Sequence, residues 1–228
     1  MTSTNSKISW KERAKKVIFE TRPFIGGDHY RSSSNEVFHT ENPANKTILA
    51  TFANGDANGI DHAVAAAHTA YHNGWRHLSP DQRKSILLAV AVCVKQAREE
   101  LALFDSLEMG MPISMALEQV DSAVEFLRYN AELVDKIYGE VVPADSANTL
   151  AMSIRQPRGV VGVISPWNFP LATAMIAIAP ALATGNCVVL KPSEQTPSSV
   201  LKLAEIAHYA GLPAGVLNVV PGRGPSAG

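Results

Sequence analysis

Two charged residues in the second half of the chain stand where a ligand could be bound. Lys191 and Glu194 are the first charges after thirty-two uncharged residues, and they follow an apolar run that is typical of a buried strand. A lysine ammonium donates hydrogen bonds, and a glutamate carboxylate can accept them from ribose hydroxyls. The pair could hold a nucleotide, or it could form a salt bridge that closes the loop.

A carboxamide stands in a second loop. Asn168 lies between Trp167 and Phe169, and Pro166 and Pro170 bracket the three residues and restrict the backbone. An amide held rigidly in apolar surroundings can donate to an oxygen that becomes negative during a reaction. A structural turn residue is the alternative interpretation.

A third segment is rich in glycine. Residues 222–227, Gly222-Arg223-Gly224-Pro225-Ser226-Ala227, fit the alanine-ended dinucleotide-binding pattern and follow an apolar strand. Pro225 is unusual inside that pattern, and the given sequence ends at Gly228, before the helix and acidic residue that would complete it. A plain glycine loop at a strand end is equally compatible.

The remaining histidines, cysteines and motif searches indicate no further catalytic or metal site. His68 and His72 have the spacing of two metal ligands on one helix, but no third ligand accompanies them, so we predict no metal site there. Cys93 falls on a predicted helix and Cys187 at the start of a buried strand, so both are interpreted as core thiols. The sequence contains no GxSxG, CxxC or P-loop motif.

The uncharged run from Gly159 to Leu190 must position the first two loops. Its prolines and glycines divide it into pieces shorter than the about 20 residues that a membrane helix needs. It therefore predicts a strand over Val160 to Ile164, a helix from Leu171 to about Ala183, and a strand over Cys187 to Leu190. Strands that are apolar on both faces are typical of a parallel sheet covered by helices.

The same alternation continues to the end of the sequence. Thr196 is expected to cap a helix with Pro197 in its first position, and Gly211 with Pro213 ends it. A strand over Val216 to Val220 and a loop over residues 221–228 follow. The resulting βαβαβ order predicts an α/β fold with an open, doubly wound, Rossmann-like parallel sheet. Ligands of such sheets bind beyond the carboxyl ends of the strands, where all three loops lie.

The first half of the chain predicts an N-terminal hairpin and a helical segment. The hairpin covers residues 24–30, and short strands are expected at 37–38 and 48–52. Helices are predicted from 57 to 138, with a capping box at Ser79 and a break at Gly110 and Pro112. One helix carries an apolar stripe of Leu117, Val120, Val124, Leu127, Ala131, Val134 and Tyr138.

Composition limits the class of protein. Of 228 residues, 46% are hydrophobic and 18% charged, with a net charge of −1, so disorder is excluded and nothing favours nucleic acid or an anionic membrane. Two cysteines make no disulfide framework, which with no recognisable secretory leader predicts a cytoplasmic protein. The basic residues among the first twenty are interpreted as a solvated lead-in helix, the alternative being a transit peptide.

Four collinear motifs stand in residues 159–228: Ile164-Ser165-Pro166-Trp167-Asn168-Phe169-Pro170, Pro180-Ala181-Leu182-Ala183-Thr184-Gly185-Asn186, Lys191-Pro192-Ser193-Glu194-Gln195-Thr196-Pro197, and Gly215-Val216-Leu217-Asn218-Val219-Val220 with its glycine loop. With these motifs, residues 159–228 resemble the NAD(P)-dependent aldehyde dehydrogenase superfamily. Outside that segment the resemblance extends through Asn42-Pro43, Trp75 and Gly110-Met111-Pro112, so it covers nearly the whole chain after residue 20. The segments around 138–141 and 155–160 are most similar to the aminoaldehyde branch, which includes γ-glutamyl-γ-aminobutyraldehyde dehydrogenases.

The resemblance implies a role for each matching residue. Asn168 would donate its amide to the thiohemiacetal oxyanion. The cofactor would be NAD rather than NADP, because the carboxylate of Glu194 would repel a 2′-phosphate. A monovalent cation would lie near Thr40, Glu41, Glu108 and Gln195. The implied cofactor-binding residues are Ile164, Ser165, Pro166 and Trp167 beside the nicotinamide and its ribose, Lys191, Ser193 and Glu194 at the adenosine ribose, and Gly224, Pro225 and Gly228 near the adenine.

The resemblance also implies a division of the chain and a limit to its chemistry. Residues 1–20 would be a lead-in, 21–137 and 159–228 parts of a truncated NAD-binding domain, and 138–158 a hairpin that joins subunits of a homo-oligomer. Members of this family are roughly twice as long, so the catalytic domain, with its nucleophilic cysteine and its glutamate base, is expected to be absent. The chain alone is expected to be inactive, and nucleotide binding or subunit interaction without chemistry is the alternative function.

Overall fold

A mixed sheet forms the centre of the computed structural model, which describes residues 9–32 and 35–228. Its strand order is β2-β1-β9-β8-β7. The strands β7 (Val160–Ile164), β8 (Cys187–Lys191) and β9 (Leu217–Val219) are parallel, and the hairpin of β1 (Phe24–Ile25) and β2 (Asp28–His29) adds to β9 antiparallel. The predicted α/β class with a parallel sheet is confirmed, and the predicted hairpin becomes the antiparallel edge of that sheet.

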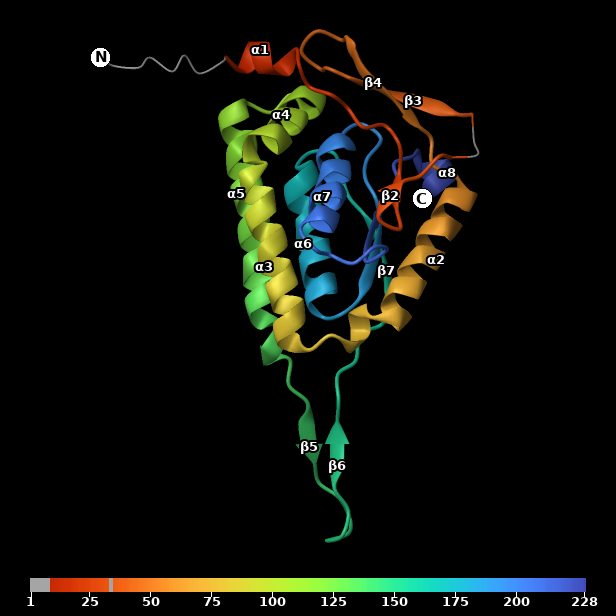
Figure 1. The fold of residues 1–228 in the computed structure, drawn as a ribbon, viewed down its shortest axis with the longest axis vertical. Helices are drawn as coiled ribbons and strands as arrows, with labels where there is room; N and C mark the ends of the chain where they lie inside the picture. Colours follow the sequence, from red (N-terminus) through yellow and green to blue (C-terminus); the bar gives the residue numbers. More distant parts are fainter. Residues whose placement is uncertain (1–8, 33–34) are drawn as a thin grey trace, which may run out of the picture.

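Helices cover both faces of the sheet. The crossover helices α6 (Pro170–Ala183) and α7 (Ser198–Tyr209) connect the parallel strands, and α2 (Ala57–Asn73) contacts all three of those strands. Figure 1 shows α6 and α7 on one side of β7 and α2 on the other. Pro180 lies inside α6, which continues to Ala183.

Three further helices form an outer layer against α6. They are α3 (Pro80–Gln96), α4 (Arg98–Met109) and α5 (Ile113–Leu133). The predicted capping box is present, because Ser79 accepts from the Gln82 N–H while the Gln82 side chain accepts from the Ser79 N–H. Gly110 ends α4 with a φ of 80°, a conformation that glycine adopts without strain.

One part of the predicted apolar stripe is wrong. Val120, Val124, Leu127 and Ala131 are buried on α5, as the periodicity predicts. Tyr138, however, lies beyond the helix and is 72% exposed. The reason is that α5 ends at Leu133, and a 3₁₀ turn, η2 (Val134–Lys136), leads the chain out of the helical layer.

A second correction concerns β7. We predicted a strand buried on both faces, but Val163 is buried while Gly162 and Ile164 are exposed, Ile164 to 73%. The physical reason is that β7 is an edge strand of the sheet that the described residues form, so fewer elements pack on it than on the central strand β8. The central strand β8 is buried over its full length, as predicted.

Two hairpins lie outside the sheet. β3 (Val37–Glu41) pairs with β4 (Ile48–Ala53), and the Phe38 and Phe52 rings stack between them and the core. β5 (Glu140–Val142) pairs with β6 (Ala151–Ser153) and projects away from the body of the protein (Figure 1). Two short elements, η1 (Trp75–His77) and α8 (Gly224–Ala227), complete the fold, and α8 shows that residues 221–228 are not entirely loop.

The predicted lead-in helix is observed at α1 (Trp10–Ala14), whereas residues 1–8 lie outside the described residues. Within the described ranges, no helix is long and apolar enough to cross a bilayer.

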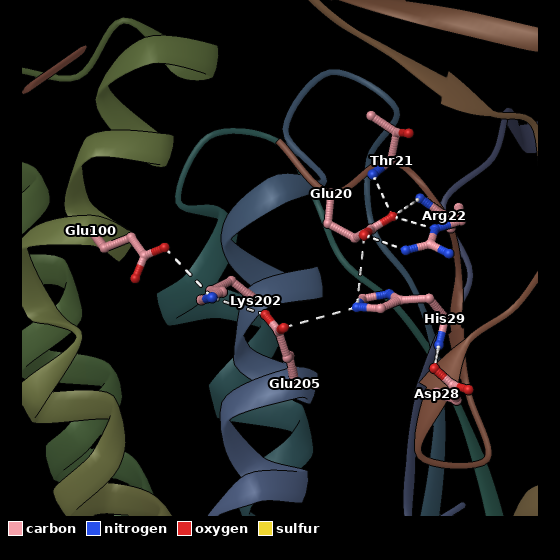
Figure 2. A network of polar contacts seen from close by, with 8 residues as sticks. All are labelled: Glu20, Thr21, Arg22, Asp28, His29, Glu100, Lys202 and Glu205. Atoms are coloured by element: carbon pink, nitrogen blue, oxygen red, sulfur yellow. Dashed lines mark hydrogen bonds and ion pairs between the residues drawn. The ribbon is translucent and has the colours of Figure 1, made fainter. Parts of the chain in front are cut away.

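A polar network fastens the N-terminal hairpin to the helices. The His29 Nε2 lies 3.8 Å from Glu20 and 3.9 Å from Glu205 on α7. Lys202 continues the chain of contacts, at 2.9 Å from Glu205 and 3.6 Å from Glu100 on α4. Figure 2 shows these side chains pointing toward one another across the gap between hairpin and helix. The network therefore stabilises the position of the β1–β2 edge of the sheet.

Candidate functional site

The carboxyl ends of the three parallel strands are level with one another. Ile164 pairs with Lys191, and Leu190 pairs with Val219. The Ser165 N–H donates to the Lys191 carbonyl at 3.1 Å, so the pairing continues one residue into the loops. The loops after β7, β8 and β9 consequently meet at the carboxyl ends of the parallel strands, as the sequence predicted. They bring all the predicted site residues to that side of the sheet.

The loop after β8 holds a buried cation. Lys191 is 7% exposed, its Nζ donates to the Pro192 carbonyl at 2.9 Å, and the Glu194 carboxylate lies 3.9 Å away. Burial lowers the pKa of Lys191, and the charge of Glu194 partly opposes that shift. Because one hydrogen bond uses one of three donors, the ammonium can still donate to a ligand beside the half-buried Glu194. Ser193 is buried between the two.

The loop after β7 presents an exposed amide beside a buried hydroxyl. Asn168 is exposed and makes no hydrogen bond within the described residues, and Trp167 is 51% exposed. The Ser165 Oγ, in contrast, is buried without a partner. Helix α6 begins at Pro170 and fixes the loop at its far end. The Asn168 amide is therefore accessible to a ligand.

The loop after β9 is held by a residue that sequence reasoning missed. The Asn54 Oδ1 accepts from the Arg223 N–H at 2.9 Å and from the Ser226 hydroxyl at 3.2 Å. Gly222 packs so closely on Gly55 that a Cβ there would lie 3.0 Å from the Gly55 nitrogen. The Asn-Gly-Asp run over 54–56, between a strand and a helix, was the available signal. A side chain at Gly224 would meet nothing within 4 Å, so this glycine leaves open space at the site.

Thr196 does not cap α7, which corrects our prediction. Pro197 occupies the cap position, and the Glu108 carboxylate accepts from the Ser198 N–H at 3.1 Å and from the Ser198 hydroxyl at 2.6 Å. The carboxyl group from α4 satisfies the helix end better than a threonine hydroxyl would, because its two oxygens accept from two donors of Ser198 at once. Burial raises the pKa of Glu108 to about 8, against the opposing effect of Ser198.

Next to this cap lies a cavity of about 360 Å³. Its lining includes Thr40, Glu41, Glu108 and Gln195, which come from three distant parts of the sequence, together with Trp167 from the loop after β7. The four residues that were expected near a monovalent cation therefore share one cavity.

The two cysteines are free thiols away from these loops. Cys187 is fully buried at the start of β8, and burial raises the pKa of its thiol to about 12. Cys93 lies on α3. The Cys187 thiol therefore stays protonated at neutral pH, which makes it a poor nucleophile. The rings of His68 and His72 lie 4.3 Å apart, and no group of three possible metal ligands forms in the part of the chain that the structure describes.

Comparison with known proteins gives consistent matches. A family model described as the aldehyde dehydrogenase family matches residues 29–228. The NADP/NAD-dependent aldehyde dehydrogenase PuuC of Escherichia coli (strain K12) is 43% identical over 96% of this chain and 44% of its own length. The aminoacetaldehyde dehydrogenase of Pseudomonas aeruginosa is 42% identical over 100% of this chain and 46% of its own.

A solved structure agrees with these matches. It is the indole-3-acetaldehyde dehydrogenase AldA of P. syringae in complex with NAD+ and IAA, with a TM-score of 0.93 and 41% identity over 96% of this chain and 44% of that one. The chain spans less than half the length of each of these three relatives.

Proposed function

This chain belongs to the aldehyde dehydrogenase family, and on that premise we propose that it serves the NAD-dependent oxidation of an aldehyde to a carboxylate, with residues 159–228 providing the cofactor-binding edge. The observation that carries the proposal is the convergence of the three loops at the carboxyl ends of β7, β8 and β9. The overall change, RCHO + NAD+ + H2O to RCOO⁻ + NADH + 2 H+, balances in atoms and charge.

The residues present fit a dinucleotide. Lys191 and Glu194 offer a donor and an acceptor for the hydroxyls of the adenosine ribose, beside Ser193. The Ser165 hydroxyl is buried and has no hydrogen-bond partner among the described residues. We assign Ser165, the end of β7 at Ile164, and the loop residues Pro166 and Trp167 to the nicotinamide end. Gly224 and Pro225 at the start of α8, and Gly228 at its end, are exposed, and there we assign the adenine. When bound, NAD accepts the two electrons that leave the aldehyde.

Asn168 is the residue that we assign to catalysis. Its amide has both donors free, and the loop that carries it is anchored by Ser165 in the sheet and by α6. Such an amide stabilises the negative oxygen that develops when a thiolate adds to an aldehyde, because its donors are oriented before the charge appears. The aminoaldehyde branch is our proposed substrate class, in keeping with the aminoacetaldehyde dehydrogenase relative.

We propose NAD over NADP because Glu194 would stand close to a 2′-phosphate and repel it. We also assign a monovalent cation to the cavity lined by Thr40, Glu41, Glu108 and Gln195. Two free cysteines favour a reducing compartment, so we propose the cytoplasm.

Titration of the 228-residue protein with NAD tests the proposal. We expect saturable quenching of Trp167 fluorescence that disappears in Trp167→Phe, and no sustained NADH formation when an aminoaldehyde is added, because no reactive thiol lies at the site. Replacing potassium by tetramethylammonium in the same titration measures the contribution of the cation. No saturation at millimolar NAD would refute the binding proposal, and sustained turnover that Asn168→Ala abolishes would refute the predicted inactivity.

The projecting hairpin of β5 and β6 is our proposed contact between subunits of a homo-oligomer. Its apolar side chains are unusually exposed: Val141 to 74%, Leu150 to 70% and Ile154 to 68%. An exposed apolar hairpin of this kind marks an interaction surface. On this assignment, residues 138–158 form the contact hairpin, which separates the two parts of the NAD-binding domain, residues 21–137 and 159–228.

Sedimentation velocity tests this assignment. Val141→Glu combined with Met152→Lys places opposite charges on a directly paired cross-strand position, so the hairpin can still form while its apolar surface is lost. We expect this variant to shift to the monomer at concentrations where the parent protein associates. Val92→Ser, which alters an exposed valine on α3, is the control and should leave the distribution unchanged. An equal shift in both variants would contradict the assignment.

A further inference from the structure

A basic cavity lies at the amino ends of the parallel strands, on the side of the sheet opposite the candidate cofactor site. It measures about 660 Å³ and is bounded by the start of α3, the end of α6 and the segment that enters β7. Arg158 and Asn186 in its lining directly precede Gly159 and Cys187, at the amino ends of β7 and β8. Because β7 is five residues long, about 16 Å of strand separates this cavity from the loops at the carboxyl ends.

Four arginines line the cavity without a counter-charge. No carboxylate is among the lining residues, and within the described residues none of the four forms an ion pair. They come from three separate segments that the fold brings together: Arg76 in η1, Arg83 in α3, and Arg155 and Arg158 before β7.

Arg83 is the clearest case of an arginine in this cavity whose positive charge has no nearby negative charge among the described residues. Its two terminal nitrogens donate to the carbonyls of Leu78 and Ala183, both at 3.2 Å, while its Nε is buried without a partner. Burial lowers the pKa of Arg83, and no neighbouring acid raises it. The guanidinium is thus held in place by neutral groups and retains its unbalanced charge.

Two of the remaining arginines, Arg155 and Arg158, are free to move onto a ligand. Arg155 and Arg158 are exposed and make no hydrogen bond or ion pair in the described part of the chain. Arg76 contacts His77 at 3.0 Å and lies over the ring of Tyr71. Gln156, in the same lining, adds an amide with free donors.

We infer that this cavity binds a multivalent phosphate anion of the size of pyrophosphate or the diphosphate of a nucleotide. Four like charges around one cavity repel one another, and an anion with several negative charges would relieve that repulsion. Guanidinium groups bind phosphate oxygens in a two-pronged geometry, and the Arg155 and Arg158 side chains are unconstrained enough to adopt it. A bound diphosphate would link α3, the end of α6 and the base of the β5–β6 hairpin.

Isothermal titration of the 228-residue protein with pyrophosphate tests the inference. We expect saturable binding in 150 mM KCl, where attraction between distant surface charges is largely screened. Arg155→Gln combined with Arg158→Gln should weaken it at least tenfold. The matched control, Arg128→Gln combined with Lys16→Gln, removes two positive charges at exposed positions outside the cavity and should change it less than twofold. Circular dichroism checks that both variants are folded.

The unfolding temperature is a second measure of binding that does not depend on the heat recorded in the titration. Pyrophosphate should raise the unfolding temperature of the parent and of the control, and leave that of the Arg155/Arg158 variant unchanged. Absence of saturable binding, or equal weakening in the control, would overturn the inference. Equally tight binding of citrate would also overturn it, because the ligand class would then be carboxylate. So would a change of oligomeric state in the Arg155/Arg158 variant that pyrophosphate does not affect.

Discussion

Asp105→Asn should make the protein more stable above pH 7, by up to about 4 kcal/mol, and change its stability little near pH 4. Asp105 lies on α4 with no exposed surface, and neither carboxylate oxygen has a hydrogen-bond partner of good geometry. Burial raises the pKa of Asp105 from 3.8 to about 7, with smaller opposing effects from Ser199 and the Leu171 backbone. Three pKa units at about 1.4 kcal/mol each give the expected size.

The sign follows from proton linkage. Between about pH 4 and pH 7 the folded protein keeps a proton on Asp105 that the unfolded chain releases, so the free energy of unfolding falls as the pH rises through this range. The contribution is fully present below about pH 4 and is lost above pH 7. Asparagine has no proton to lose, so this part of the pH dependence disappears, while the part due to Glu108, whose pKa is also raised, remains.

Urea unfolding at pH 4.5, 6 and 8 measures the effect. Asp121→Asn is the matched control, because a hydrogen bond from Arg98 lowers the pKa of Asp121 to about 2. That carboxylate stabilises the folded state when ionised, and the stabilisation is lost as the pH falls toward 2, so its asparagine variant should be destabilised at pH 8. If Asp105→Asn lowers stability at pH 8, Asp105 has partners that compensate its charge and the prediction fails.

Lys191→Met should weaken NAD binding about tenfold to a hundredfold. Lys191 is 7% exposed, so methionine keeps the packing of the aliphatic part while it removes the ammonium. A hydrogen bond from a charged group to a ligand contributes about 1.5–3 kcal/mol, and about 1.4 kcal/mol corresponds to tenfold in affinity. The measurement is the dissociation constant for NAD, with the unfolding temperature as the check on folding.

Glu194→Gln tests the preference for NAD over NADP separately from the affinity for both cofactors, which Lys191 is expected to provide. We expect it to improve NADP binding relative to NAD, because the amide cannot repel a 2′-phosphate but can still contact the ribose. The Lys191 variant should weaken both cofactors. Unchanged affinity in Lys191→Met, or an unchanged preference in Glu194→Gln, would show that the cofactor lies elsewhere.

Much of the local structure was predictable because its signals are local. The capping box at Ser79, the helix end at Gly110 and the strand before Lys191 each depend on a few neighbouring residues, and each lies where it was predicted. The βαβαβ order also determined that the three loops share one edge, because parallel strands joined by crossovers end on the same side.

Contacts between distant segments were not predictable in this way. Glu108 rather than Thr196 holds the start of α7, and Asn54 holds the glycine loop, although each partner is more than eighty residues away in the sequence. The prediction that β7 is buried on both faces was wrong for the same reason. Periodicity reports that a residue is apolar, whereas exposure depends on which strand or helix lies beside it.

The amino-acid sequence by itself therefore determined the order and type of the elements and the side of the sheet where we propose that the cofactor binds, because backbone propensities and hydrophobic patterns act locally. The tertiary structure alone decided which carboxylates are buried, as at Asp105 and Glu108, and which cations lack a counter-charge, as at Arg83. Those properties depend on the dielectric and the partners that surround a group, and residues remote in sequence supply both.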